Sequence, residues 1–124
     1  MDLKQVAKDS TQMLTSYLTY QALKIVLGQL SETNPPLAIW LNDFSSKHSI
    51  QNGEAYLEAL LQVESETALR LMTVRQHLAE EMLEFLPEMV EMNIQQSNMG
   101  HRRQHLEKLT GLVPSDLSAD EQSG

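Results

Sequence analysis

Residues 78–91 read LAEEMLEFLPEMVE, and their pattern indicates a helix with two different faces. At about 100° per residue, four acidic side chains fall within one narrow arc: Glu80, Glu84, Glu88 and Glu91. Apolar side chains occupy the opposite side: Leu78, Met82, Phe85, Leu86 and Met89. The acidic arc is typical of a hydrated outer face, whereas the apolar side needs a partner.

The helical pattern extends in both directions from this stretch. It predicts one long helix over residues 66–109, with Ser65 as its cap. Pro87 lies inside this helix, and it can neither donate to the carbonyl four residues earlier nor avoid crowding it. We therefore expect a kink at this proline.

Two more helices are expected from the N-terminus onward. Residues 3–31 contain no proline and repeat apolar residues every three or four positions. Gly28, near the end of this helix, indicates either fraying or a close backbone approach. Asn34 is expected to cap a second helix that begins at Pro35, a residue suited to the first helical turn, and whose apolar stripe ends at Phe44.

The remaining segments complete an all-α prediction. A polar loop is expected over residues 45–49, and Asn52-Gly53 indicates a cap followed by a third, short helix. No alternating polar and apolar run indicates a strand. The sequence therefore predicts a single four-helix domain over residues 1–112, two of its helices long and two short, and a disordered acidic tail over residues 113–124.

Composition narrows the class of protein. The chain has 124 residues, of which 41% are hydrophobic, and a formal net charge of −8, which makes nucleic acid an unexpected partner. Because there is no cysteine, thiol chemistry is excluded and a reducing cytoplasm is the expected setting. The longest apolar run, residues 37–41, is too short to cross a membrane. The apolar face of the long helix exceeds what three neighbours cover, so we expect a homodimeric helical bundle.

No arrangement of side chains predicts catalysis, and no catalytic residue, metal or cofactor is expected. The sequence has neither a Gly-rich phosphate loop nor a nucleophile elbow. His101 and His105 are four residues apart, but arginine follows His101, so the His-Glu-x-x-His pattern of zinc peptidases is absent. A metalloenzyme that uses these two histidines is kept as an alternative, which metal analysis would test.

Two groups of side chains favour binding. Tyr17 and Tyr20 combine apolar rings with polar hydroxyls, which fits either a core position or a peptide groove. Arginines occur near both ends of the long helix: Arg70, Arg75, Arg102 and Arg103. They fit either contacts with a carboxylate-rich partner or pairing within the helix, as between Glu66 and Arg70.

Six blocks of sequence resemble a known family: KQVAKD at 4–9, SYLTYQAL at 16–23, ETNPPLA at 32–38, MTVR at 72–75, EFLPEM at 84–89 and RRQHLE at 102–107. With these blocks, over roughly residues 2–109, the chain resembles the cyanobacterial Rubisco assembly chaperone RbcX. The resemblance implies an all-helical homodimer whose bent long helices pair in an antiparallel arrangement and whose first helices line a central crevice. It implies no catalytic activity.

The resemblance also implies a client, the Rubisco large subunit. Its extended, acidic, Phe-containing C-terminal segment would bind in the crevice, whose positions match Tyr17, Tyr20, Gln29, Ile50 and Gln51. The folded body of the same subunit would contact the corners of the dimer, whose positions match Arg70, Asn98 and Arg102. At Gln76 several relatives carry glutamate, so this chain has one charge fewer on that client-contact surface.

Three questions are left open by the sequence: whether a Rubisco client exists, how tightly it binds and whether the protein resides in carboxysomes. A helical dimerisation or regulatory module without a Rubisco client would share the expected fold but would bind no peptide. Family members release their client when small subunits bind, which requires only moderate affinity, but the affinity itself and residence in carboxysomes are not encoded in any motif.

Overall fold

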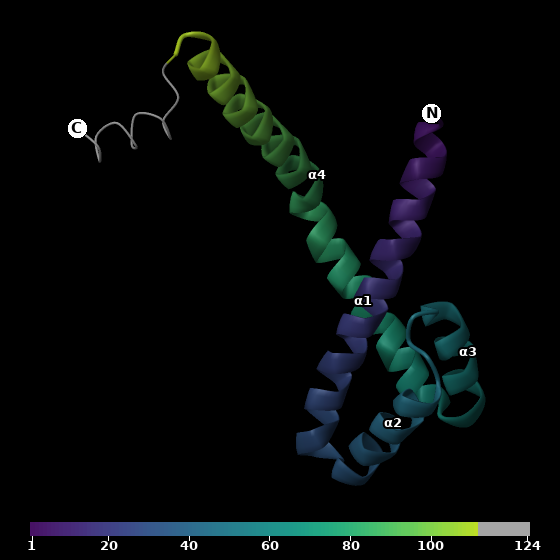
Figure 1. The fold of residues 1–124 in the computed structure, drawn as a ribbon. Coiled ribbons are helices and arrows are strands. Elements are labelled where there is room, and N and C mark those ends of the chain that lie inside the picture. Colours follow the sequence, from purple (N-terminus) through teal and green to yellow (C-terminus); the bar gives the residue numbers. More distant parts are fainter. Residues whose placement is uncertain (112–124) are drawn as a thin grey trace. The chain divides into compact units, whose positions relative to one another are not determined.

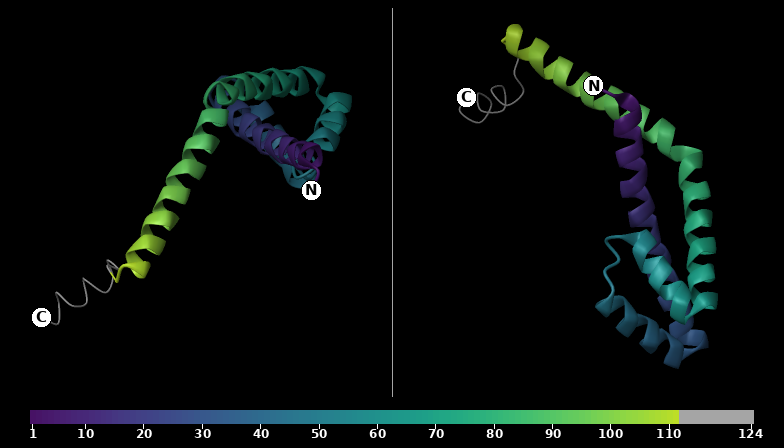
Figure 2. Two further views of the ribbon diagram at one scale, coloured as in Figure 1. Left: turned by 90° about the horizontal axis from the view of Figure 1, so that it is seen from above. Right: turned by 90° about the vertical axis from the view of Figure 1, so that its right-hand side faces the viewer.

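The computed structural model describes residues 1–111, which form four helices (Figure 1). In chain order they are α1 (Leu3–Thr33), α2 (Pro35–Lys47), α3 (Gly53–Val63) and α4 (Ser65–Leu109), seen from two further directions in Figure 2. The predicted all-α fold, with four helices and a long C-terminal helix, is confirmed. The acidic tail expected over residues 113–124 lies outside the described residues, as does the domain boundary at residue 112.

Short polar side chains start the first three helices. The side-chain oxygens of Asp2, Asn34 and Asn52 each accept a hydrogen bond from a backbone N–H in the first turn, at 3.0, 3.4 and 3.2 Å respectively. Each bond satisfies an amide that has no partner within its own helix. The caps predicted at Asn34 and Asn52 are thereby confirmed.

Two predicted helix boundaries were wrong. α2 continues to Lys47, so the first residues of the expected 45–49 loop are helical. Ser45 Oγ donates to the Leu41 carbonyl at 2.8 Å, a bond back to the preceding turn that keeps the serine compatible with the helix. At the start of α4, the Ala68 N–H donates to the Glu64 carbonyl at 3.1 Å, so Glu64 rather than Ser65 precedes the first helical turn.

Gly28 shows neither of the features expected of it. α1 continues past this glycine to Thr33, so the helix does not fray there. A Cβ built on Gly28 would meet nothing within 4 Å among the described residues beyond the helix's own backbone. The backbone of the described chain therefore makes no close approach at this glycine.

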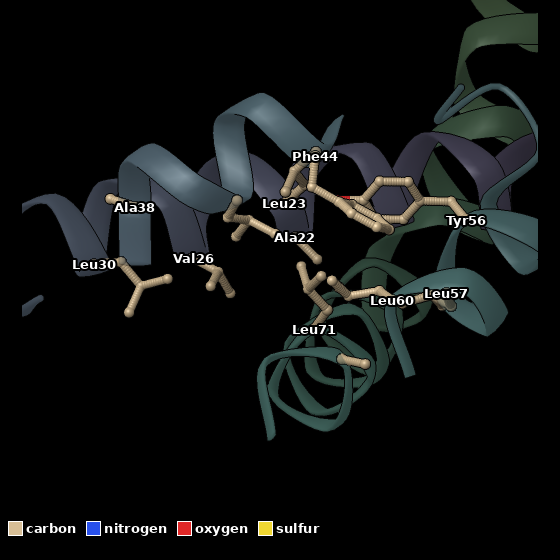
Figure 3. Close-up of a cluster of buried hydrophobic side chains, with 12 residues drawn as sticks. Ala22, Leu23, Val26, Leu30, Ala38, Phe44, Tyr56, Leu57, Leu60 and Leu71 are labelled. Atoms are coloured by element: carbon tan, nitrogen blue, oxygen red, sulfur yellow. The ribbon is translucent and has the colours of Figure 1, made fainter. Parts of the chain in front are cut away.

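The helices belong to two compact units, Met1–Met82 and the residues from Leu83 onward. The first unit holds the hydrophobic core, in which buried side chains from all four helices meet (Figure 3). Its largest fully buried apolar members are Val26, Leu41, Tyr56, Leu60 and Leu71. Burying a side chain of this size contributes about 1.5–3 kcal/mol. This core fixes the faces that α1 and α2 present to solvent.

The second unit contains the rest of α4. The helix is continuous through Pro87, and the kink expected there stays a prediction. Many of its large apolar side chains are exposed in the described chain: Leu83, Phe85, Met89, Val90, Met92, Ile94, Met99, Leu106 and Leu109. An apolar surface of this extent is typical of an interaction face.

Candidate functional site

A shallow groove of about 300 Å³ lies against α1 and the C-terminal part of α2. Two residues predicted for the crevice, Tyr20 and Ile50, both line it. The other lining residues are Leu23, Lys24, Leu27, Asn42, Ser45 and Ser46. Leucines beside hydroxyl and carboxamide groups suit an apolar side chain together with the polar backbone that carries it.

Both tyrosines of α1 are exposed. Tyr17 is 56% exposed and Tyr20 is 43% exposed, so the core position considered for them is wrong in the described chain. The two residues are three positions apart and share one face of the helix. Lys24 Nζ lies 5.6 Å from the centre of the Tyr20 ring, within cation–π range. The groove therefore has an aromatic wall with a positive charge beside it.

Hydrogen bonds from the core hold the groove in place. The hydroxyl oxygens of Tyr56 and Ser45 are 2.6 Å apart. Because the Ser45 hydroxyl already donates to the Leu41 carbonyl, the Tyr56 hydroxyl is the donor in this pair. Phe44 packs edge-on against Tyr56, with 5.6 Å between ring centres. Burial raises the pKa of Tyr56, so its hydroxyl stays protonated and able to donate at neutral pH.

Gln29 lies away from this groove. It follows Tyr20 by nine residues on α1, which places it on nearly the opposite side of the helix. Its Oε1 accepts a hydrogen bond from Arg70 Nη2 of α4 at 2.5 Å. The structure thus joins a residue predicted for the crevice to one predicted for the client-contact surface. Within residues 1–111, Arg70 forms this bond rather than an ion pair with Glu66.

Arg75 has a structural role that the sequence did not reveal. Its Nη1 donates to Thr19 Oγ1 at 3.0 Å, and its two terminal nitrogens bind the Glu54 carboxylate at 2.6 and 3.1 Å. Thr19 is fully buried, so Arg75 supplies a hydrogen-bond donor to a hydroxyl oxygen that water does not reach. The same hydrogen bonding lowers the pKa of the Glu54 carboxyl. Arg75 therefore ties α1, α3 and α4 together.

Gln51 and Gln76 are both exposed. Gln51 follows Ile50 in the connection between α2 and α3, where its backbone N–H donates to Ser49 Oγ at 3.2 Å. Gln76 donates through Nε2 to Glu80 at 3.3 Å, along the same face of α4. Gln51 is the sequence neighbour of the groove residue Ile50, whereas Gln76 lies on α4, which contributes no residue to the groove.

Asn98 and Arg102 lie one turn apart on α4 in the second unit, and both are exposed. Arg102 lines a shallow hollow with the apolar side chains of Met99 and Leu106. A guanidinium beside apolar atoms suits a protein surface that carries carboxylates. Both residues are therefore placed where a partner could reach them.

Neither a metal centre nor a membrane span is found in the described part of the chain. No three His, Asp or Glu side chains between residues 1 and 111 gather closely enough to hold a metal ion. Likewise, none of the helices within that range combines the length and apolar character needed to cross a bilayer.

Sequence reasoning missed four polar residues of the groove: Lys24, Asn42, Ser45 and Ser46. Lys24 carried a usable signal, because it follows Tyr20 by four residues and so shares its helix face. The other three come from α2, and their position depends on how that helix packs against α1.

Comparison with known proteins shows to which family the chain is similar. The family described as "RbcX protein" matches residues 1–111. The RuBisCO chaperone RbcX of Nostoc sp. is 58% identical over 120 residues, which cover 97% of this chain and 90% of the relative. The RuBisCO chaperone RbcX of Thermosynechococcus vestitus is 52% identical over 117 residues, or 94% of this chain and 93% of the relative.

A solved structure shares the fold as well. The crystal structure of RbcX in complex with substrate is 55% identical, with a TM-score of 0.72, and the match covers 89% of this chain and 99% of that chain. Similarity of sequence and of backbone thus extends over nearly all of the described helices. The chain belongs to the RbcX family.

Proposed function

We propose that this chain is a Rubisco assembly chaperone that binds the C-terminal segment of the Rubisco large subunit. Its relatives are named RuBisCO chaperones, and one was solved in complex with substrate. The observation that carries the proposal is the exposed groove beside Tyr20 and Ile50. Its task is binding rather than catalysis, and its place of action is the cytoplasm.

The groove has the chemistry that an extended client segment needs. Burying a client Phe against Tyr20 and Ile50 contributes about 1.5–3 kcal/mol before the cost of ordering the segment. The client's backbone amides lose water in the same step and need new partners. Asn42 and Ser46 line the groove, and the carboxamide of Gln51 is adjacent in sequence, so both donors and acceptors are at hand. Moderate affinity follows, as release of the client requires.

Lys24 matches the acidic character of the client. Its ammonium group stands beside the Tyr20 ring and lines the same groove. A positive charge at a solvent-exposed rim speeds encounter with an acidic segment and orients it, while contributing modestly to affinity. Binding of the peptide should therefore weaken as salt is raised.

A second copy of the chain completes the site. Tyr20 and Gln29 lie on nearly opposite sides of α1, so one groove of one chain does not contain both. A crevice lined by two α1 helices would let one client segment meet the tyrosine face of one copy and the glutamine face of the other. The exposed apolar side chains of α4 supply a surface for such a dimer.

The folded body of the large subunit would contact other exposed residues, Arg70 in the first unit and Asn98 and Arg102 in the second. Their side chains are able to meet client carboxylates and amides. The family resemblance implies glutamate at the position of Gln76 in several relatives, so client contact at Gln76 should depend less on client cations in this chain. Two copies of each contact in a dimer compensate for weak individual contacts.

Isothermal titration with a synthetic C-terminal peptide of a Rubisco large subunit tests the groove. Tyr20→Ala should weaken binding several-fold in a folded protein, because the aromatic wall is lost. Ile39→Ala is the matched control, since this α2 side chain is 72% exposed and does not line the groove. An unchanged Kd for Tyr20→Ala would overturn the groove assignment. A wild-type chain that does not bind the peptide would favour a dimerisation module without a Rubisco client.

Sedimentation equilibrium tests the dimer. The proposal expects a species of twice the chain mass of 14.0 kDa at working concentrations. Replacing Phe85, which is 50% exposed on α4, by Glu should shift the population towards single chains. A wild-type protein that sediments as single chains would overturn the shared crevice.

A further inference from the structure

We propose that Arg70 positions the Gln29 side chain for client binding, and that the crevice contacts and the client-contact surface are therefore coupled. The inference rests on the proposed function and extends it to a residue pair. The observation is the hydrogen bond that Arg70 Nη2 of α4 donates to Gln29 Oε1 of α1, at 2.5 Å, between residues 41 positions apart in sequence.

The chemistry of the two side chains fixes the orientation of the amide. A guanidinium group carries only donors, so the amide atom that faces Arg70 must be the oxygen of Gln29. The amide nitrogen then points away from Arg70, and within residues 1–111 it makes no hydrogen bond, so both of its N–H groups can donate to a client. Gln29 therefore presents donors to a client, which suits the backbone carbonyls of an extended segment and its acidic side chains.

Without Arg70 this orientation would be lost. Gln29 and Arg70 are both exposed, and an exposed glutamine samples several rotamers and both directions of its terminal amide. A hydrogen bond from a charged donor is stronger than one between neutral groups. By holding one orientation before the client arrives, Arg70 lowers the ordering cost of binding. Arg70 is thus a positioning residue as well as a contact residue.

The coupling changes what substitutions at the two sites should do. If the two contact sets were independent, neutralising Arg70 would impair handling of the whole large subunit and leave binding of the isolated C-terminal peptide intact. Because Arg70 acts through Gln29, peptide binding should weaken as well. The effect should disappear when Gln29 is already absent.

A double-mutant cycle with the full chain tests this, using the synthetic C-terminal peptide of a Rubisco large subunit and isothermal titration. Arg70→Met should weaken the peptide Kd about fivefold, the effect of losing one well-placed hydrogen bond. In a Gln29→Ala background, Arg70→Met should cause no further loss. Arg70→Lys should recover part of the affinity, because lysine retains a donor. Gln29→Glu should bind weakly although it keeps the Arg70 contact, because it has no N–H to offer.

A charge-matched control separates positioning from general electrostatics. Lys8→Met removes the same unit charge from an exposed position of α1 and should leave the Kd at the wild-type value. An Arg70→Met protein that binds as tightly as the Lys8→Met protein would overturn the inference. The inference would also be overturned if Arg70→Met weakened peptide binding equally in the wild-type and Gln29→Ala backgrounds. Failure of the wild-type chain to bind the peptide would instead refute the proposed function, so the two failures are distinguishable.

Discussion

Removing either end of the Ser45–Tyr56 hydrogen bond should destabilise the first unit, but by unequal amounts. Tyr56 is 1% exposed, and its hydroxyl donates to Ser45 over 2.6 Å. Ser45→Ala leaves that buried hydroxyl without its acceptor and should lower the free energy of unfolding by about 2–3 kcal/mol, the desolvation penalty of an unpaired polar group.

Tyr56→Phe should cost only about 1 kcal/mol. It leaves Ser45 Oγ still donating to the Leu41 carbonyl at 2.8 Å. Ser45 is half-buried and lines the groove, so water can reach the lone pair that the tyrosine hydroxyl vacates. The packing of the ring against Phe44 is unchanged, because phenylalanine keeps the same aromatic face.

The double variant separates the two contributions. Once Tyr56 has become phenylalanine, Ser45→Ala no longer strands a phenol, so the combined loss should be clearly smaller than the sum of the single losses. Urea unfolding followed by circular dichroism measures all three, at one protein concentration because association adds to apparent stability. A larger loss for Tyr56→Phe than for Ser45→Ala, or strictly additive losses, would refute the donor assignment.

Further outcomes are expected at the contacts around Thr19, at Gly28 and in the second unit. Arg75 holds the pKa of Glu54 below its ordinary 4.5, so their pairing stabilises the fold above pH 4.5, and this stabilisation is lost as the pH falls through the lowered pKa. The free energy of unfolding of the wild type, measured at a series of acid pH values, should therefore fall in this range. The same fall in Glu54→Gln would contradict the role given to Glu54. Gly53→Ala should lower the free energy of unfolding by about 1 kcal/mol, since the new Cβ would lie 3.2 Å from Thr19. Gly28→Ala, with nothing within 4 Å of the new Cβ among the described residues beyond the helix's own backbone, should raise the free energy of unfolding by about the same amount in the urea assay. Equal urea midpoints for the two variants would show that the Thr19 side chain moves aside without cost. Arg102→Ala should reduce recovery of assembled Rubisco from whole large subunits more than it weakens peptide binding, because Arg102 belongs to the second unit, whereas the residues that line the Tyr20 groove belong to the first. Equal losses in the two measurements would argue against separate contacts.

Local signals account for most of what the sequence predicted correctly. Asn34 and Asn52 cap helices through bonds to amides three residues ahead, so their role can be inferred from a few neighbouring letters. The end of α2 was misplaced because Ser45 and Ser46 resemble loop residues by composition. Their hydroxyls in fact bond to carbonyls of their own helix. Local composition alone does not distinguish these two outcomes.

The contacts between helices could not be predicted in this way. Arg75 meets Glu54 across 21 residues and Thr19 across 56, and Arg70 meets Gln29 across 41. Periodicity shows which face a residue occupies, but not which face of another helix lies against it. The crevice residues were proposed from family resemblance for the same reason, and the groove gathers only Tyr20 and Ile50 of that set in one chain.

Asn34 is the whole connection between α1 and α2. Its N–H donates to the Leu30 carbonyl at 2.7 Å, and its own carbonyl accepts from the Ala38 N–H at 3.1 Å, in addition to the side-chain cap. A connection of one residue whose backbone N–H, backbone carbonyl and side-chain oxygen are all hydrogen-bonded cannot accommodate an inserted or deleted residue without a change in the helices that it joins. Inserting or deleting a single residue there would rotate α2 by about 100° relative to α1, swinging Leu41 out of the interior. Length variation in this family should therefore avoid this connection.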